Sequence, residues 1–110
     1  MTYFGKGEFD RAIDDYEKAI SIEPSNPFLY NNRGAAYYQK RVFDKAVSDY
    51  TVALSFAPNN IEALTNRAFA YCAMGRLDEA RSDIATLKKL GAWIDSRLIE
   101  LTGRTKTGTP

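Results

Sequence analysis

The sequence repeats itself every 34 residues, and this interval limits the possible folds more than any other feature. Large apolar residues, small residues and prolines recur in the same places of successive units. A chain with such a period folds as a stack of similar units, each of which buries apolar surface against its neighbours. The recurring sets are Tyr3, Tyr37 and Tyr71; Phe9, Phe43 and Leu77; Ala12, Ala46 and Ala80; Tyr16, Tyr50 and Ile84; and Pro24 and Pro58.

Within each unit the apolar residues have the spacing of an α-helix. Between Phe43 and Leu54 they recur at intervals of three and four residues, which places them on one helical face. The strict alternation that is typical of a half-buried β-strand does not occur there. The pattern therefore predicts an all-α fold.

Prolines and asparagines divide each unit into two helices. Asn26 can cap a helix whose first turn contains Pro27, and Asn60 offers the same cap in the next unit. Pro24 and Pro58 end the preceding helices, because proline cannot donate the hydrogen bond that continues a helix. The expected helices are 9–22, 27–40, 43–56, 61–74 and 77–90.

A second turn separates the two helices of a unit. Gly7, Arg41 and Gly75 share this position, where a residue in the left-handed conformation commonly ends a helix. An arginine with positive φ costs on the order of 1 kcal/mol relative to glycine. We therefore expect the substitution Arg41→Gly to stabilise the protein.

These runs of residues resemble the tetratricopeptide-repeat (TPR) family. The strongest matches are Asn-Arg-Gly-Ala-Ala-Tyr at 32–37 and Phe-Asp-Lys-Ala-Val-Ser-Asp-Tyr at 43–50, with echoes at 66–71 and 77–84. The resemblance implies a right-handed superhelical array of antiparallel helix pairs. In such an array the leading helix of each pair lines a concave groove and the trailing helix forms the convex back.

About two and a half repeats are expected, because Met1 falls within the leading helix of the first unit. An apolar stripe that includes Trp93, Leu98 and Leu101 predicts a helix that caps the C-terminal end of the stack. The expected domain is 1–102, divided into a partial repeat 1–26, repeat 27–60, repeat 61–91 and capping helix 92–102. Residues 103–110 are rich in threonine and glycine and are expected to form a disordered tail.

The leading helices carry aromatic and amide side chains on the face opposite their core residues. Aromatic rings supply apolar area to an extended peptide, and an amide can bond the N–H and C=O groups of its main chain. We therefore expect a scaffold that binds a peptide or a partner protein in the groove. The candidate binding residues are Phe28, Asn31, Asn32, Ala35, Tyr38, Gln39, Glu62, Thr65, Asn66 and Phe69.

Asn32 and Asn66 occupy one position of the repeat. This arrangement resembles the asparagine ladders with which some TPR proteins hold peptide backbones irrespective of sequence. The alternative is that both asparagines are solvated or cap local turns.

The carboxylate clamp, with which other TPR domains hold the C-terminal Glu-Glu-Val-Asp of heat-shock chaperones, does not match this sequence. One of its asparagine positions falls on Met1, and Glu62 and Asn66 stand where lysine and arginine are needed. If the pattern starts one helix later, Asn31 and Ala35 replace lysine and asparagine. An acidic C-terminal tail is therefore not the expected ligand, because none of these side chains neutralises its carboxylates.

Two arginines, Arg33 and Arg67, recur near the edge of the core. Their stems are expected to pack against apolar residues, and their guanidinium groups are expected to pair with the recurring Asp15, Asp49 or Asp83. This structural role is a better interpretation than anion binding.

Composition argues against other classes of function. The 15 Lys and Arg and 14 Asp and Glu leave a net charge of +1, which attracts neither nucleic acid nor anionic lipid. Without histidine and with the single Cys72, expected to be a small apolar filler, the chain lacks the groups of a metal site or of common catalysis. We expect no enzyme activity, cofactor, metal, nucleic acid or membrane partner, and the cytoplasm as the default location.

Self-association is the alternative function. A truncated leading helix leaves the apolar face of residues 9–22 partly uncovered, including Phe9, Ile13, Tyr16 and Ile20. Upstream sequence or a second copy of the chain would cover this face, so a homodimer is possible.

Overall fold

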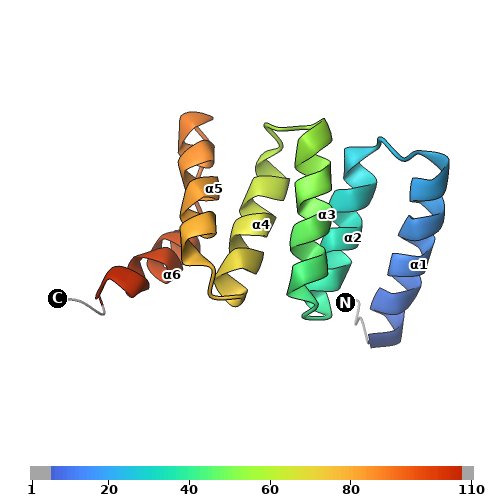
Figure 1. Cartoon of the computed structure of the whole chain (residues 1–110), viewed down its shortest axis with the longest axis horizontal. Coiled ribbons are helices and arrows are strands. Elements are labelled where there is room, and N and C mark those ends of the chain that lie inside the picture. The colour runs from blue at the N-terminus through green and yellow to red at the C-terminus, as the bar shows by residue number, and fades with distance from the viewer. Residues whose placement is uncertain (1–5, 108–110) are drawn as a thin grey trace.

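The computed structural model describes residues 6–107 of the chain, and side chains for residues 7–103. All regular elements in this range are helices, which confirms the all-α prediction. Five helices stand in an antiparallel row, and the last helix lies across the end of the row (Figure 1). The helices are α1 (Lys6–Ile22), α2 (Pro27–Gln39), α3 (Phe43–Phe56), α4 (Ile61–Ala73), α5 (Leu77–Lys89) and α6 (Ser96–Thr107).

Each helix packs mainly on the helices that precede and follow it. The pairs α2–α3 and α4–α5 form two complete repeats, and α1 packs on α2 from the other side. The stack is elongated, with extents of 49 × 29 × 26 Å. This is the architecture of a solenoid in which each repeat contacts only its neighbours.

The helix starts follow the predicted caps. The side-chain oxygen of Asn26 accepts a hydrogen bond of 3.0 Å from the N–H of Phe28, and that of Asn60 accepts one of 3.0 Å from the N–H of Ala63. These bonds satisfy amides that have no partner inside their own helix. The helices α2, α4 and α5 each end one residue earlier than the sequence predicted.

The left-handed turn is also confirmed in the two complete repeats. Arg41 has φ of 65° and Gly75 has φ of 76°, and each follows the leading helix of its pair. The prediction for Gly7 was wrong, because α1 already begins at Lys6 and contains this glycine. A Cβ atom built at Gly7 would have no neighbour within 4 Å, so close packing does not require glycine at this position.

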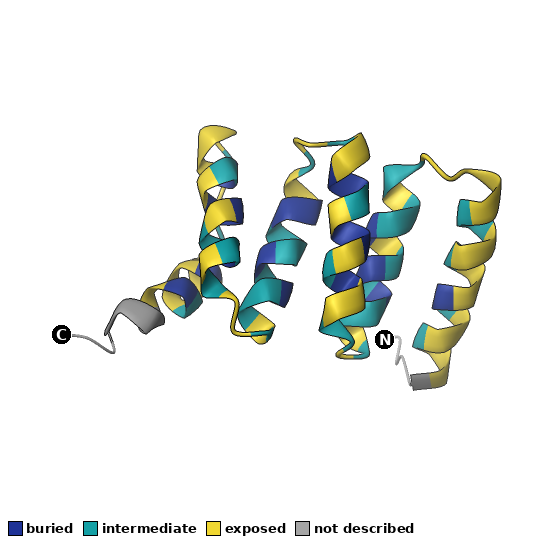
Figure 2. Ribbon diagram, viewed as in Figure 1, coloured by how far each residue is buried: buried dark blue, intermediate teal, exposed yellow. Residues whose placement is uncertain are grey.

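The core consists of small side chains that alternate with a few large ones. Ala46, Ala63 and Ala80 are fully buried where helices cross, and Tyr50 and Leu87 fill the space beside them. Figure 2 shows the buried positions on the faces that the helices turn toward one another. No helix within residues 6–107 is long and apolar enough to span a membrane.

The C-terminal helix differs from its prediction at both ends. It was expected at 92–102 but runs over Ser96–Thr107, so the expected disordered tail is helical at 103–107, and residues 108–110 lie outside the described part of the chain. The late start has a physical cause, because Ala92 and Ile94 pack on the core without regular secondary structure and the Asp95 carboxylate then caps the N–H of Arg97 at 2.9 Å. Leu98 is fully buried as expected, but Trp93 is 79% exposed and does not belong to the capping stripe.

Candidate functional site

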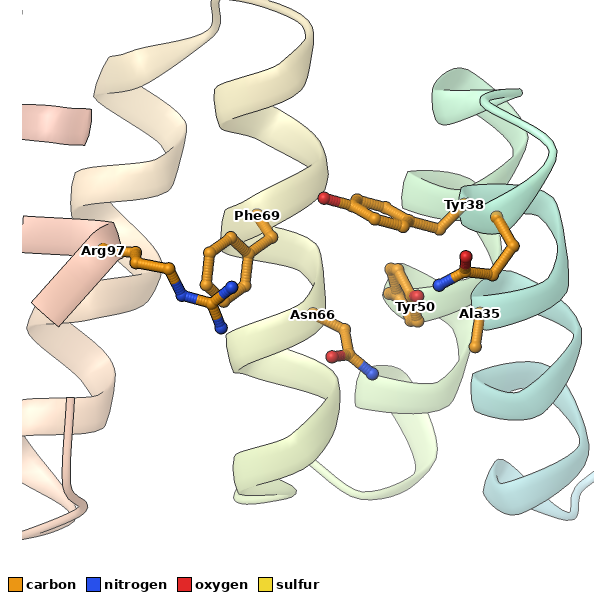
Figure 3. A pocket seen from close by; sticks show the side chains of 7 residues that line it. Ala35, Tyr38, Tyr50, Asn66, Phe69 and Arg97 are labelled. Carbon is orange, nitrogen blue, oxygen red and sulfur yellow. The ribbon is translucent and has the colours of Figure 1, made fainter. Parts of the chain in front are cut away.

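A pocket of about 260 Å³ lies between α2, α4 and the start of α6, and a tyrosine of α3 also lines it. Figure 3 shows its aromatic rings and polar side chains directed toward one another from different helices. The pocket is lined by Ala35, Tyr38, Gln39, Tyr50, Asn66, Phe69 and Arg97.

The helical period brings these side chains to one place. On α2, Ala35, Tyr38 and Gln39 are three and four residues apart and share a face. A Cβ atom at Gly34 would contact Tyr50 of α3, which also lines the pocket. On α4, Asn66 and Phe69 share the corresponding face, so two leading helices form facing walls.

Aromatic packing fixes the shape of the pocket. Tyr38 lies edge-on to Phe43, with 5.3 Å between ring centroids. Tyr50 forms the buried floor, and its burial raises the pKa of its hydroxyl well above the ordinary value. Both rings are held by neighbours on other helices, so the apolar part of the pocket is formed before any ligand arrives.

The structure brings together half of the candidate residues from the sequence. Ala35, Tyr38, Gln39, Asn66 and Phe69 line the pocket. The other candidates lie outside it. Asn32 and Glu62 are exposed, Thr65 is half-buried, and Phe28 is 63% exposed at the start of α2.

Asn31 corrects the sequence analysis, because it is 2% exposed and a groove ligand cannot reach it. Its Oδ1 atom is buried and has no hydrogen-bond partner within the part of the chain that the structure describes. Asn31 precedes Ala35 and Tyr38 by four and seven residues, so it shares the helical face that lines the pocket, but the packing of the stack covers its side chain.

Two residues of the pocket were not among the candidates. Tyr50 is one of the recurring large residues of the repeat, and Arg97 does not belong to the apolar stripe expected for the capping helix. The sequence signal that could have located Arg97 is Asp95. An aspartate that caps a helix marks its start, and the start determines on which face each following residue lies.

Arg97 is the cation of the pocket, and two contacts hold it in place. Its Nε and Nη2 atoms donate to the Asp95 carboxylate at 3.1 and 2.7 Å. Its guanidinium carbon lies 5.0 Å from the centroid of the Phe69 ring, a cation–π distance. The hydrogen bonds raise the pKa of Arg97 and lower the pKa of the Asp95 carboxyl.

The recurring arginines have the predicted structural role. Arg33 donates two hydrogen bonds to Asp49, and Arg67 donates two to Asp83. These hydrogen bonds raise the pKa of both guanidinium groups. Cys72 is half-buried, and burial raises the pKa of its thiol.

The repeats match known sequence families. A TPR repeat model matches residues 2–40, and a tetratricopeptide repeat model matches residues 49–82. A stretch of 35 residues is 49% identical to RNA polymerase II-associated protein 3 of Homo sapiens and 46% identical to that of Rattus norvegicus. In both comparisons the stretch is 32% of this chain and spans only 5% of the length of the relative.

Solved structures with the same arrangement of helices come from TPR domains. The first TPR of Spaghetti (RPAP3) bound to the HSP90 peptide SRMEEVD has a TM-score of 0.83 at 29% identity, covering 91% of this chain and 82% of that chain. The second TPR of Spaghetti bound to the same peptide has a TM-score of 0.73 at 31% identity, covering 76% of this chain and 78% of that chain. Both the repeat models and these structures agree with the period of the sequence, and the chain therefore belongs to the tetratricopeptide-repeat family.

Proposed function

We propose that this chain is a non-catalytic scaffold that binds an extended peptide segment of a partner protein on its concave side. The observation that carries the proposal is the pocket that four helices form together. Its rings, Tyr38, Tyr50 and Phe69, offer apolar area, while Gln39 and Asn66 offer amides at the rim. Similar domains were solved with short peptides, which supports a peptide as the class of ligand.

The ligand differs from the acidic chaperone tail that those domains were solved with. Glu62 is exposed at the start of α4, and its negative charge repels a carboxylate. Arg33 and Arg67 are already bound to aspartates. Arg97 is the one cation that lines the pocket among the described residues, and one cation does not match the several carboxylates of the acidic tail.

Titration calorimetry with the peptide SRMEEVD tests this distinction. We expect its affinity to be at least about tenfold weaker than that of a peptide selected on this chain from a random library. Comparable affinities would show that the clamp motif is not needed for binding the acidic tail, and would overturn the distinction.

The asparagine ladder is tested with the same selected peptide. Substitution of both Asn32 and Asn66 by alanine should weaken binding roughly thirtyfold, because each amide would contribute about 1 kcal/mol through hydrogen bonds to the peptide main chain. Asn59→Ala is the matched control, since Asn59 is an exposed asparagine in the turn before α4. Equal affinity of the double variant and the control, with equal thermal stability, would show that the asparagines are only solvated.

Association between two copies through α1 is a second candidate. Ile22 is 79% exposed at the end of α1, and Tyr16 and Ile20 are only half-buried. Ile13 is buried, so the uncovered face is smaller than the sequence suggested. Light scattering at high protein concentration should show a dimer that Ile22→Asp dissociates, and a monomer at all concentrations would remove this candidate.

A further inference from the structure

We propose that the α6 end of the pocket selects a ligand with one carboxylate beside an apolar side chain, and that Arg97 binds this carboxylate. The inference rests on the proposed function and names the chemistry of its ligand. It differs from the clamp considered for the sequence, because the cation comes from α6 and not from a leading helix of a complete repeat.

The first step is the fixed position of the guanidinium group. Asp95 holds its Nε–Nη2 edge, and the Phe69 ring covers one of its faces. A long exposed side chain normally loses conformational entropy when it binds a ligand. The two contacts reduce this loss, because Arg97 is already held in one orientation.

The second step concerns the edge of the Arg97 guanidinium group that remains available to a ligand. Asp95 uses Nε and Nη2, and Nη1 makes no hydrogen bond with any described residue. The Nη1–Nη2 edge can therefore bind a second carboxylate in the two-point geometry that arginine favours. The Arg97 side chain is 72% exposed, so a ligand can reach this edge.

The third step is the surroundings of that edge. Figure 3 shows the Arg97 guanidinium beside the Phe69 ring at one end of the pocket, and the Asn66 amide pointing toward Ala35 across it. Tyr38, Gln39 and Asn66 add further donors, and no acidic side chain lines the pocket within the described residues. A carboxylate gains donors there, while the adjacent rings accommodate an apolar group.

Three pentapeptides test the proposal. The first is acetylated and amidated Ala-Phe-Glu-Phe-Ala; the second has Gln in place of Glu; the third is the Gln peptide with a free C-terminal carboxylate. Amide chemical shifts of the labelled chain are measured by NMR during each titration. We expect shifts at Phe69 and Arg97, and binding roughly three- to tenfold tighter for a carboxylate peptide than for the neutral one.

The arms also identify the source of the carboxylate. Tighter binding of the Glu peptide points to an acidic side chain within the ligand, and tighter binding of the third peptide points to a chain terminus. Either result supports the inference.

Arg97→Met and Arg76→Met form a matched pair of variants. Arg76 also lies over an aromatic ring, at 5.4 Å from the Tyr71 centroid, and also pairs with a nearby acid, Glu79, but it does not line the pocket. Arg97→Met should remove the preference for the carboxylate peptide over the neutral peptide. Arg76→Met should keep the preference.

Three outcomes overturn the inference and are distinguishable. Equal binding of all three peptides by the unsubstituted chain, with shifts in the pocket, refutes selection of a carboxylate but leaves peptide binding intact. A preference that survives in Arg97→Met assigns the selection to another group. If no peptide shifts any pocket amide at millimolar concentration while the chain is folded, both this inference and the proposed function fail.

Discussion

Gly34 lies so close to Tyr50 that a Cβ atom at position 34 would stand 2.9 Å from Cε1 of the ring. It would also stand 3.2 Å from the carbonyl oxygen of Ala46, which is backbone and cannot rotate away. Overpacking of this kind costs about 1–3 kcal/mol, and alanine returns up to about 1 kcal/mol through its helix propensity. Gly34→Ala should therefore lower the free energy of unfolding by about 1 kcal/mol in denaturant titrations.

The next repeat provides the compensating substitution. There Ala68 takes the position of Gly34, and Ile84 takes the position of Tyr50 in the same buried cluster. In a Tyr50→Ile background, Gly34→Ala should stabilise the protein, because the methyl group fills space that the ring no longer occupies. An equal loss in both backgrounds would show that the ring does not limit residue 34.

Arg67 and Asp83 join the two helices of the second complete repeat through hydrogen bonds of 2.9 and 2.6 Å. The Asp83 side chain is only 4% exposed, so Arg67→Met leaves a buried carboxylate without its partner. Loss of one member of a buried pair costs about 3–5 kcal/mol, and we expect about 2–4 kcal/mol because Arg67 is partly exposed. Adding Asp83→Leu to Arg67→Met should recover part of this loss, and additive effects of the two substitutions would contradict the pairing.

Arg41 has φ of 65° in an exposed turn. Arg41→Gly should raise the free energy of unfolding by about 0.5–1 kcal/mol, because glycine adopts this conformation without strain. Gly75→Ala, at φ of 76° in the equivalent turn, should lower it by a similar amount. Thermal melting of both variants checks the pair, and an unchanged or lower melting temperature for Arg41→Gly would contradict the first expectation.

Cys72 should react slowly with thiol reagents in the folded protein. Burial raises the pKa of its thiol, so less of the reactive thiolate is present at any pH below that value. The raised pKa also means that the stabilisation from this group is complete below about pH 9 and is lost as the pH rises toward the folded-state value. Labelling at pH 8 should be slower than for the unfolded chain, and equal rates would place the thiol in open solvent.

The predictable part of the fold was the part that recurs. The caps at Asn26 and Asn60, the positive φ of Arg41 and the pairing of Arg67 with Asp83 all follow from positions that occur in more than one unit. A repeated environment lets one residue be interpreted by comparison with its equivalent.

The errors lie where that comparison ends. The segment after Gly91 has no equivalent asparagine cap or proline, so the start of α6 depended on how Ile94 packs and on Asp95. Arg97 reaches the pocket only because α6 crosses the stack, and no periodic signal encodes that crossing. The position of Asn31 in the helical period is that of a groove residue. Its burial, however, depends on neighbouring side chains, which the helical period alone does not reveal.

Because of the position of α6, ligand binding would involve the end of the stack that makes the fewest packing contacts. This helix supplies Arg97 to the pocket, yet within the described chain it packs only on α4 and α5. Local opening at a terminus needs less free energy than opening of an interior helix. An occupied pocket would therefore slow amide hydrogen exchange along α6 more than along α3, because a ligand bound to Arg97 and α4 would oppose the opening of α6.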